Sequence, residues 1–139
     1  MISLEHLNLV VRDIPAMVKF YRSAFPHWRI REEGVGEWSG KNRKWLHLGD
    51  DYQYLTLNDN GEGKNRDLSG HVTGLAHFGF VTDNLDALMG RLTDAGYVVS
   101  SDGADEPYRR NVYFVDPDGF EVEFVQYLSD IPEERNHSV

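Results

Sequence analysis

The stretch HFGFVTDNLDALMGRLTDAGY, residues 77–97, repeats the pattern of HLNLVVRDIPAMVKFYRSAF, residues 6–25. Each stretch begins with a histidine and a short run of β-forming residues. Each then reaches an aspartate, Asp13 or Asp83, which can cap a helix by accepting a backbone N–H bond. An internal repeat of this kind indicates a structure built from two similar modules.

The second part of each stretch has the period of an amphipathic helix. Apolar side chains recur three or four residues apart over residues 14–25, and Pro26 ends that pattern. The same spacing holds over residues 85–95, where the following Gly96 suits a left-handed C-cap. The sequence therefore predicts one helix in each half, with its apolar side against a sheet.

Three further strands are predicted after each helix. They lie near Trp28–Glu33, Arg43–Gly49, Tyr52–Asn58, Tyr97–Ser101, Asn111–Val115 and Phe120–Tyr127. The order β-α-β-β-β thus occurs twice, which predicts an α+β fold in which two βαβββ modules form a curved mixed sheet. The concave face of such a sheet is a natural small-molecule site.

The whole chain, residues 1–139, is expected to form a single domain. Its predicted parts are a first module at about 3–58, an exposed linker at 59–72, a second module at about 73–128 and a tail at 129–139. The linker is polar and has no calcium-loop spacing.

The composition narrows the class of protein. A net charge of −9 argues against nucleic acid or an anionic membrane as the main partner. No apolar run reaches the roughly 18 residues of a membrane span, and the N-terminus has no signal-peptide pattern. Since cysteine is absent, disulfides and thiol chemistry are excluded. We therefore expect a cytoplasmic protein.

Alternation along the strands predicts which side chains face the cavity. In the last strand Val122 and Phe124 should pack under the helices, which turns Glu121 and Glu123 inward. The same reasoning places these residues inward: Trp45, His47, Tyr54, Thr56, Asn111 and Tyr113.

Two histidines and a carboxylate can then meet in one pocket. His6 and His77 occupy equivalent points of the repeat, and Glu123 faces the same way, whereas Glu121 is expected to be a carboxylate at the rim. Two imidazoles and one carboxylate suit a divalent ion such as Fe, Mn or Zn, with open positions for substrate. A single strand histidine is more often a structural, hydrogen-bonded residue, so the prediction depends on the pair. The chain has no glycine-rich phosphate-loop motif.

The sequence resembles the vicinal oxygen chelate superfamily, which includes glyoxalases, extradiol dioxygenases, fosfomycin-resistance enzymes and bleomycin-binding proteins. The motifs that carry the resemblance are HLNLVVRD, KFYRSAF, LAHFGFVTDNLD and NVYFVDPDGFEVEFV, which together span most of the chain. The combination is specific for the fold and weak for the reaction.

The resemblance implies a ligand set, which is His6, His77 and Glu123. It also implies the metal, a divalent Fe, Mn, Zn or Ni ion. A fourth ligand of glyoxalases falls at Tyr54 here, beside Gln53, and a tyrosine there argues against lactoylglutathione lyase activity. Tyr113 corresponds to a substrate-contacting tyrosine of the fosfomycin enzymes, but the downstream arginine of those enzymes has no counterpart.

The resemblance further implies a metal-dependent lyase or dioxygenase that acts on a small, metal-chelating, oxygenated substrate. Tyr54, Tyr113 and His47 are the candidate catalytic residues, and Trp45, Tyr54 and Tyr113 the candidate substrate contacts. A homodimer is expected, with the site formed in one chain or from swapped modules.

Two alternatives remain open. One is a metal-free protein that binds an aromatic or cationic antibiotic of the bleomycin type, and an acidic, aromatic cavity would suit such a ligand. The other is an accessory protein whose pocket is vestigial.

Overall fold

The structure is a computed structural model that describes residues 1–137. It divides the chain into two compact units, Met1–Lys64 and Asn65–Val139, and the division falls inside the predicted linker. The first unit contains β1 (His6–Val10), α1 (Ile14–Ala24), β2 (Arg29–Trp38), β3 (Lys41–Gly49) and β4 (Tyr54–Asn58). The second contains β5 (Phe78–Val81), α2 (Leu85–Asp94), β6 (Ser101–Asp102), β7 (Arg109–Val115), β8 (Glu121–Tyr127) and α3 (Pro132–Arg135).

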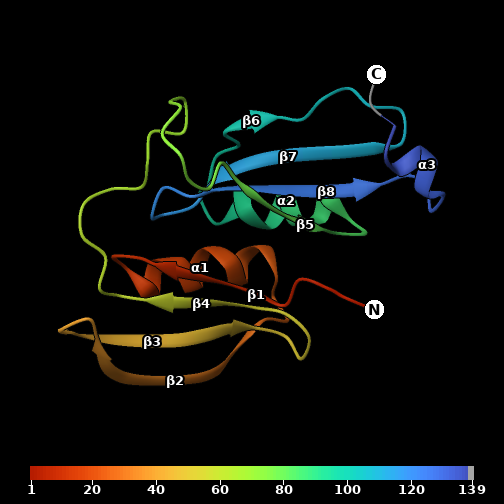
Figure 1. Cartoon of the computed structure of the whole chain (residues 1–139). Helices are drawn as coiled ribbons and strands as arrows, with labels where there is room; N and C mark the ends of the chain where they lie inside the picture. Colours follow the sequence, from red (N-terminus) through yellow and green to blue (C-terminus); the bar gives the residue numbers. More distant parts are fainter. Residues whose placement is uncertain (138–139) are drawn as a thin grey trace. The chain divides into compact units, whose positions relative to one another are not determined.

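The two units share one topology, as Figure 1 shows. The first sheet has the order β1-β4-β3-β2 and the second β5-β8-β7-β6. In each, the first strand runs parallel to the last, and the remaining pairs are antiparallel. The α+β fold with two βαβββ modules is therefore confirmed. The curved sheet with a concave face, which the two modules are expected to form, stays a prediction, as does their union in one domain.

The buried face of each sheet follows the predicted alternation. Leu46, Leu48, Leu55 and Leu57 are at most 5% exposed, whereas Trp45, His47 and Tyr54 between them are only half-buried. In the second unit the side chains of Val112, Phe114, Val122 and Phe124 are buried in the same way. Each sheet thus has an apolar face under its helix and an open face that carries polar and aromatic groups.

Helix α1 begins and packs as its sequence predicts. Asp13 caps it, because its Oδ1 accepts a hydrogen bond from the Ala16 backbone N–H at 3.0 Å. Met17, Phe20 and Tyr21 are fully buried.

Helix α2 corrects the prediction for its cap. The N-cap is Asn84 and not Asp83, since Asn84 Oδ1 accepts from the Ala87 backbone N–H at 3.1 Å. Asp and Asn are both good caps, and they are adjacent here, so local sequence could not choose between them. Gly96 after the helix has φ +94°, the left-handed conformation expected at that position.

Asn84→Ala is expected to lower the free energy of unfolding by about 1 kcal/mol, because the Ala87 N–H loses its acceptor. Asp83→Ala, one residue earlier and exposed, is the matched control and should have no measurable effect. Urea unfolding followed by circular dichroism measures both. An equal loss in the two variants would contradict the assignment of the cap.

Some strand boundaries differ from prediction. In place of a strand at Tyr97–Ser101 the structure has only the two-residue β6, because the Tyr97 N–H still bonds Leu92 O at the end of α2. β2 extends to Trp38 and passes a β-bulge between Ile30 and Glu32.

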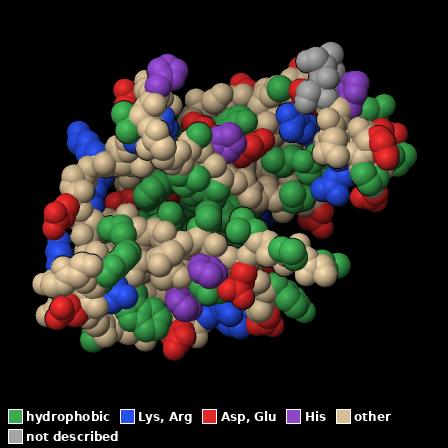
Figure 2. All heavy atoms as spheres, viewed as in Figure 1, with side chains coloured by type: hydrophobic (Ala, Val, Ile, Leu, Met, Phe, Trp, Pro, Cys, Tyr) green, Lys and Arg blue, Asp and Glu red, His purple; other side chains and the backbone are tan. Residues whose placement is uncertain are grey.

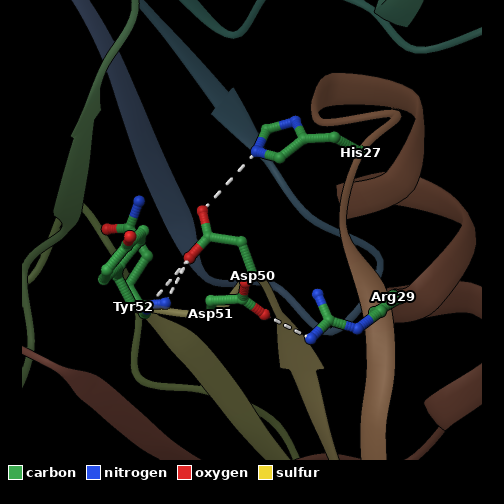
Figure 3. A network of polar contacts seen from close by, with 6 residues as sticks. His27, Arg29, Asp50, Asp51 and Tyr52 are labelled. Carbon is green, nitrogen blue, oxygen red and sulfur yellow. Dashed lines mark hydrogen bonds and ion pairs between the residues drawn. The ribbon is translucent and has the colours of Figure 1, made fainter.

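A polar network fixes the turn between β3 and β4 (Figure 3). Asp50 Oδ1 accepts hydrogen bonds from the backbone N–H groups of Tyr52 and Gln53, each at 2.9 Å, and Asp50 Oδ2 lies 3.5 Å from His27 Nε2. Arg29 pairs with Asp51 beside it. Burial acts to raise the pKa of Asp50, but these hydrogen bonds outweigh it, so the pKa lies below its ordinary value.

Because folding lowers the pKa of Asp50, its charged carboxylate stabilises the folded state at pH values above the pKa that Asp50 has in the unfolded chain. That contribution disappears as the pH falls through the folded-state value, below about pH 4. Asp50→Asn keeps an oxygen that can accept from Tyr52 and Gln53 but removes the titration. We expect its stability to fall less steeply than that of the wild type between about pH 5 and pH 2.

Urea unfolding at a series of pH values tests this expectation. Asp105→Asn, in an exposed loop, is the control. Parallel pH profiles for the wild type and Asp50→Asn would contradict it.

Candidate functional site

His77 and Glu123 meet on the open face of the second sheet. His77 directly precedes β5, one residue outside the strand in which it was expected, and Glu123 lies in the middle of β8. His77 Nε2 is 3.2 Å from Glu123 Oε2, and His77 Nδ1 is 3.8 Å from Glu121 Oε1. Glu123 is the more buried of the two acids, with 14% of its side chain exposed against 26% for Glu121.

The register of β5 and β8 explains this contact. Gly79 is the residue opposite Glu123, so no side chain projects next to the carboxylate from that position. A Cβ built on Gly79 would lie 3.6 Å from Glu123 Cβ and 3.8 Å from its Oε2. The imidazole of His77, two residues earlier, reaches Glu123 along this diagonal.

Asn111 orients the other oxygen of Glu123. Its Nδ2 donates a hydrogen bond to Glu123 Oε1 at 2.8 Å. The carboxylate is therefore held from two sides, by Asn111 on β7 and by His77 before β5. The alternation of β7 placed Asn111 on this face, but nothing in the local sequence indicated its partner.

Tyr113 stands beside the same pair. It is the residue opposite Glu123 in the antiparallel register, and its ring meets the His77 ring edge-on at 5.3 Å. Burial raises the pKa of the Tyr113 hydroxyl, and the charges of Glu123 and Glu121 raise it further. The phenol therefore stays protonated near neutral pH and can donate a hydrogen bond to a bound molecule.

His6 lies on the open face of the first sheet, with 44% of its side chain exposed. Its Nδ1 is 2.9 Å from Glu5 Oε1, and its ring stacks on Tyr54 at 4.8 Å with an interplanar angle of 6°. The Tyr54 hydroxyl donates to the same Glu5 oxygen at 3.3 Å. His6 and Tyr54 are neighbours because the parallel register of β1 and β4 pairs them.

The aromatic side chains predicted for the cavity gather around Tyr54. The His47 ring stacks on Tyr54 at 4.6 Å, and the Trp45 ring lies 5.2 Å from His47. Arg31 places its guanidinium 4.4 Å from the centre of the Tyr54 ring, a cation–π contact that the sequence did not suggest. We call Trp45, His47, Tyr54 and His6 the aromatic row.

Gly34 makes room for the row. A Cβ at Gly34 would approach Trp45 Cζ2 to 2.8 Å, so the indole packs directly against the backbone of β2. Trp38, in the same strand, is 39% exposed and contacts Arg43 instead.

The donors at His77 and Glu123 fit a divalent metal. One imidazole nitrogen and one buried carboxylate oxygen, already close together, are of the type that Fe, Mn, Zn and Ni accept. Residues 1–137 contain no group of three or more histidine, aspartate or glutamate side chains near enough to hold an ion. The second unit thus brings two of the three predicted ligands together, and the metal-binding role of His6, His77 and Glu123 stays a prediction.

On the face seen in Figure 2, lysine and arginine are interspersed with aspartate and glutamate and form no continuous basic surface. No helix among the described residues has the length and apolar character needed to cross a bilayer.

Comparison with known families identifies the superfamily of this chain. The sequence profile of the Glyoxalase/Bleomycin resistance protein/Dioxygenase superfamily matches residues 3–124. The chain belongs to this superfamily. It is the vicinal oxygen chelate superfamily that the sequence motifs indicated, and its members act as enzymes or as binding proteins. A comparison with curated protein sequences finds no match.

Solved structures of this superfamily share the fold. A glyoxylase/bleomycin resistance protein/dioxygenase domain from Frankia sp. EAN1pec aligns with a TM-score of 0.74 and 22% identity over 99% of each chain. A fosfomycin resistance protein from Listeria monocytogenes aligns with 0.70 and 19% over 97% of this chain and 99% of its own. An antibiotic-binding protein from Streptomyces sp. CB03234 aligns with 0.61 and 20% over 91% and 97%. At these identities the likeness establishes the fold alone.

Proposed function

We propose that this member of the vicinal oxygen chelate superfamily is a divalent-metal-dependent enzyme, a lyase or dioxygenase. Its substrate would be a small oxygenated molecule that chelates the metal. The observation that carries the proposal is the contact of His77 Nε2 with Glu123 Oε2 at 3.2 Å, on an open sheet face. His77 and Glu123 would be ligands, with His6 as the third ligand predicted from the repeat.

The metal would supply a Lewis acid that polarises the bound oxygens of the substrate. The chain's own groups complete the site. Tyr113 keeps its proton and can donate a hydrogen bond to a substrate oxygen near His77. Asn111 holds the Glu123 carboxylate in place. Tyr54, His47 and Trp45 would contact the substrate through the aromatic row, and Tyr54 or His47 would be further candidates for acid–base chemistry.

Metal analysis of protein purified without chelator tests the proposal. We expect close to one divalent ion per chain in the wild type, identified by elemental mass spectrometry, and a large loss in His77→Ala. His71→Ala removes an exposed histidine before β5 and is the matched control. Negligible metal in the wild type, also after incubation with Fe, Mn, Zn or Ni salts, would overturn the proposal.

A metal-free binding protein is the second candidate. The aromatic row favours it, since stacked aromatic side chains can bind the flat rings of an antibiotic of the bleomycin type. Calorimetric titration with bleomycin, with and without a chelator, distinguishes the metal-free binding protein from the metal-dependent enzyme. Tight binding that is unchanged by the chelator and weakened by Trp45→Ala would favour this candidate.

We also propose a cytoplasmic homodimer. Pairing is expected from the superfamily, and the site can then form within one chain or from swapped modules. Sedimentation of the purified chain at several concentrations measures the assembly, and a monomer at every concentration would contradict it.

A further inference from the structure

We infer that Asn111 is a positioning residue for Glu123, and that the bare backbone at Gly103 is what allows Asn111 to do this. The inference rests on the proposed function, because it assigns Asn111 a role in preparing a metal ligand. Its evidence lies entirely in the second unit, in β7, β8 and the segment that follows β6.

The geometry of the sheet makes Asn111 a diagonal neighbour of Glu123. In the antiparallel register Asn111 is opposite Val125, and Glu123 is opposite Tyr113. The Asn111 amide therefore reaches two residues along β8 to donate its 2.8 Å hydrogen bond to Glu123 Oε1. Glu123 Oε2 is left facing His77 at 3.2 Å. The amide thereby fixes the rotamer in which one carboxylate oxygen stays beside the imidazole.

Asn111 is itself held by the segment after β6. The Gly103 N–H, directly after β6, donates to Asn111 O at 3.1 Å, and the Ser100 N–H, directly before β6, donates to Tyr113 O at 2.9 Å, so the chain follows the edge of β7 on both sides of β6. Gly103 lies directly against the Asn111 side chain. A Cβ at Gly103 would lie 1.7 Å from Asn111 Oδ1 and 2.3 Å from its Cγ. Any other residue at this position would displace the amide or the segment.

The buried oxygen of the amide argues against a purely structural role. Asn111 Oδ1 is buried and has no hydrogen-bond partner among the described residues. An unsatisfied buried acceptor is unfavourable for folding, so a residue kept for stability alone would not be expected to leave one. The other polar atom of the same amide, Nδ2, is the one that donates a hydrogen bond to Glu123. The amide is therefore better explained by what it does to the carboxylate.

Co(II) titration of the purified full chain tests the inference, with visible absorption as the readout. We expect Asn111→Ala to bind Co(II) about 10–100-fold more weakly than the wild type, as is typical when a partner of a metal ligand is removed. Its Co(II) absorption bands should also change, because Glu123 is no longer fixed. Its unfolding midpoint is measured in parallel, because loss of the donor leaves Glu123 Oε1 without its hydrogen-bond partner, and Co(II) affinities are compared between folded proteins.

Gly103→Ala should weaken Co(II) binding in the same direction, through displacement of Asn111. Two matched controls accompany these variants. Gly90→Ala, in α2, adds a methyl group with nothing within 4 Å, and Asn42→Ala removes an exposed amide from the first unit. Both should bind Co(II) like the wild type. If Gly103→Ala fails to fold, Asn111→Ala still decides the question.

The outcomes separate this inference from the proposed function. If the wild type binds Co(II), His77→Ala loses it and Asn111→Ala binds within about twofold of the wild type, the positioning role is overturned and the metal site is retained. A wild type that binds no Co(II) would overturn both.

Discussion

Glu123→Gln is expected to weaken divalent-metal binding at least ~100-fold, more than the loss typical for a residue that only supports a ligand. The substitution keeps the size of the side chain and an oxygen that can still accept from Asn111, but it removes the negative charge that would face the cation. Because Glu123 is 14% exposed and lies 3.2 Å from His77 Nε2, no other acid in the second sheet is equally well placed.

Glu121→Gln is the matched control for this prediction. Glu121 has the same chemistry, lies two residues earlier on the same face, and is 3.8 Å from the other nitrogen of His77. We expect its effect on metal affinity to stay below about tenfold. Competition with a chromophoric chelator measures both affinities. If Glu121→Gln has the larger effect, the ligand is Glu121 and the match to the superfamily motif is shifted by two residues.

Phe124→Ala is expected to lower the free energy of unfolding by about 3–5 kcal/mol, although Phe124 is adjacent to Glu123 in the chain. Phe124 is fully buried, and its ring lies 6.0 Å from that of Phe114 and 6.4 Å from that of Phe80. Truncation leaves a cavity that the surrounding sheet and α2 cannot fill by small shifts.

Urea unfolding followed by circular dichroism measures this loss. All three tryptophans lie in the first unit, so their fluorescence reports on that unit, whereas circular dichroism reports on both. Phe80→Ala is the control, since Phe80 is a half-buried phenylalanine of the same sheet. It should lower the free energy of unfolding clearly less than Phe124→Ala. Equal losses would show that burial of Phe124 does not dominate the stability of this sheet.

Local patterns predicted the elements of the fold well, because their causes are local. The helical period over residues 14–25 and 85–95, the left-handed Gly96 and the alternation around Phe124 each depend on neighbours within a few residues. Where two neighbours compete, the local pattern is ambiguous. Asp83 and Asn84 are both good caps, and only the entry of the chain into α2 selects Asn84. The short β6 is a similar case, because its length depends on pairing with β7.

The candidate site was predictable only as a set of facing residues. The repeat singled out His6 and His77, and alternation turned Glu121 and Glu123 to the open face. Neither could show that Glu123 contacts His77, that Asn111 orients it or that Tyr54 stacks on His6. Such contacts depend on the register between strands that are distant in sequence, and a shift of register would replace every one of them.

By itself, therefore, the sequence determined the two-module architecture and the face of the sheet on which each side chain lies, because both follow from periodicity along one strand or helix. The tertiary structure alone decided which of those side chains meet. It brought Gly79 opposite Glu123 and the bare backbone of Gly103 against Asn111, because distances across a sheet are set by pairing between strands and not by the order of residues within one.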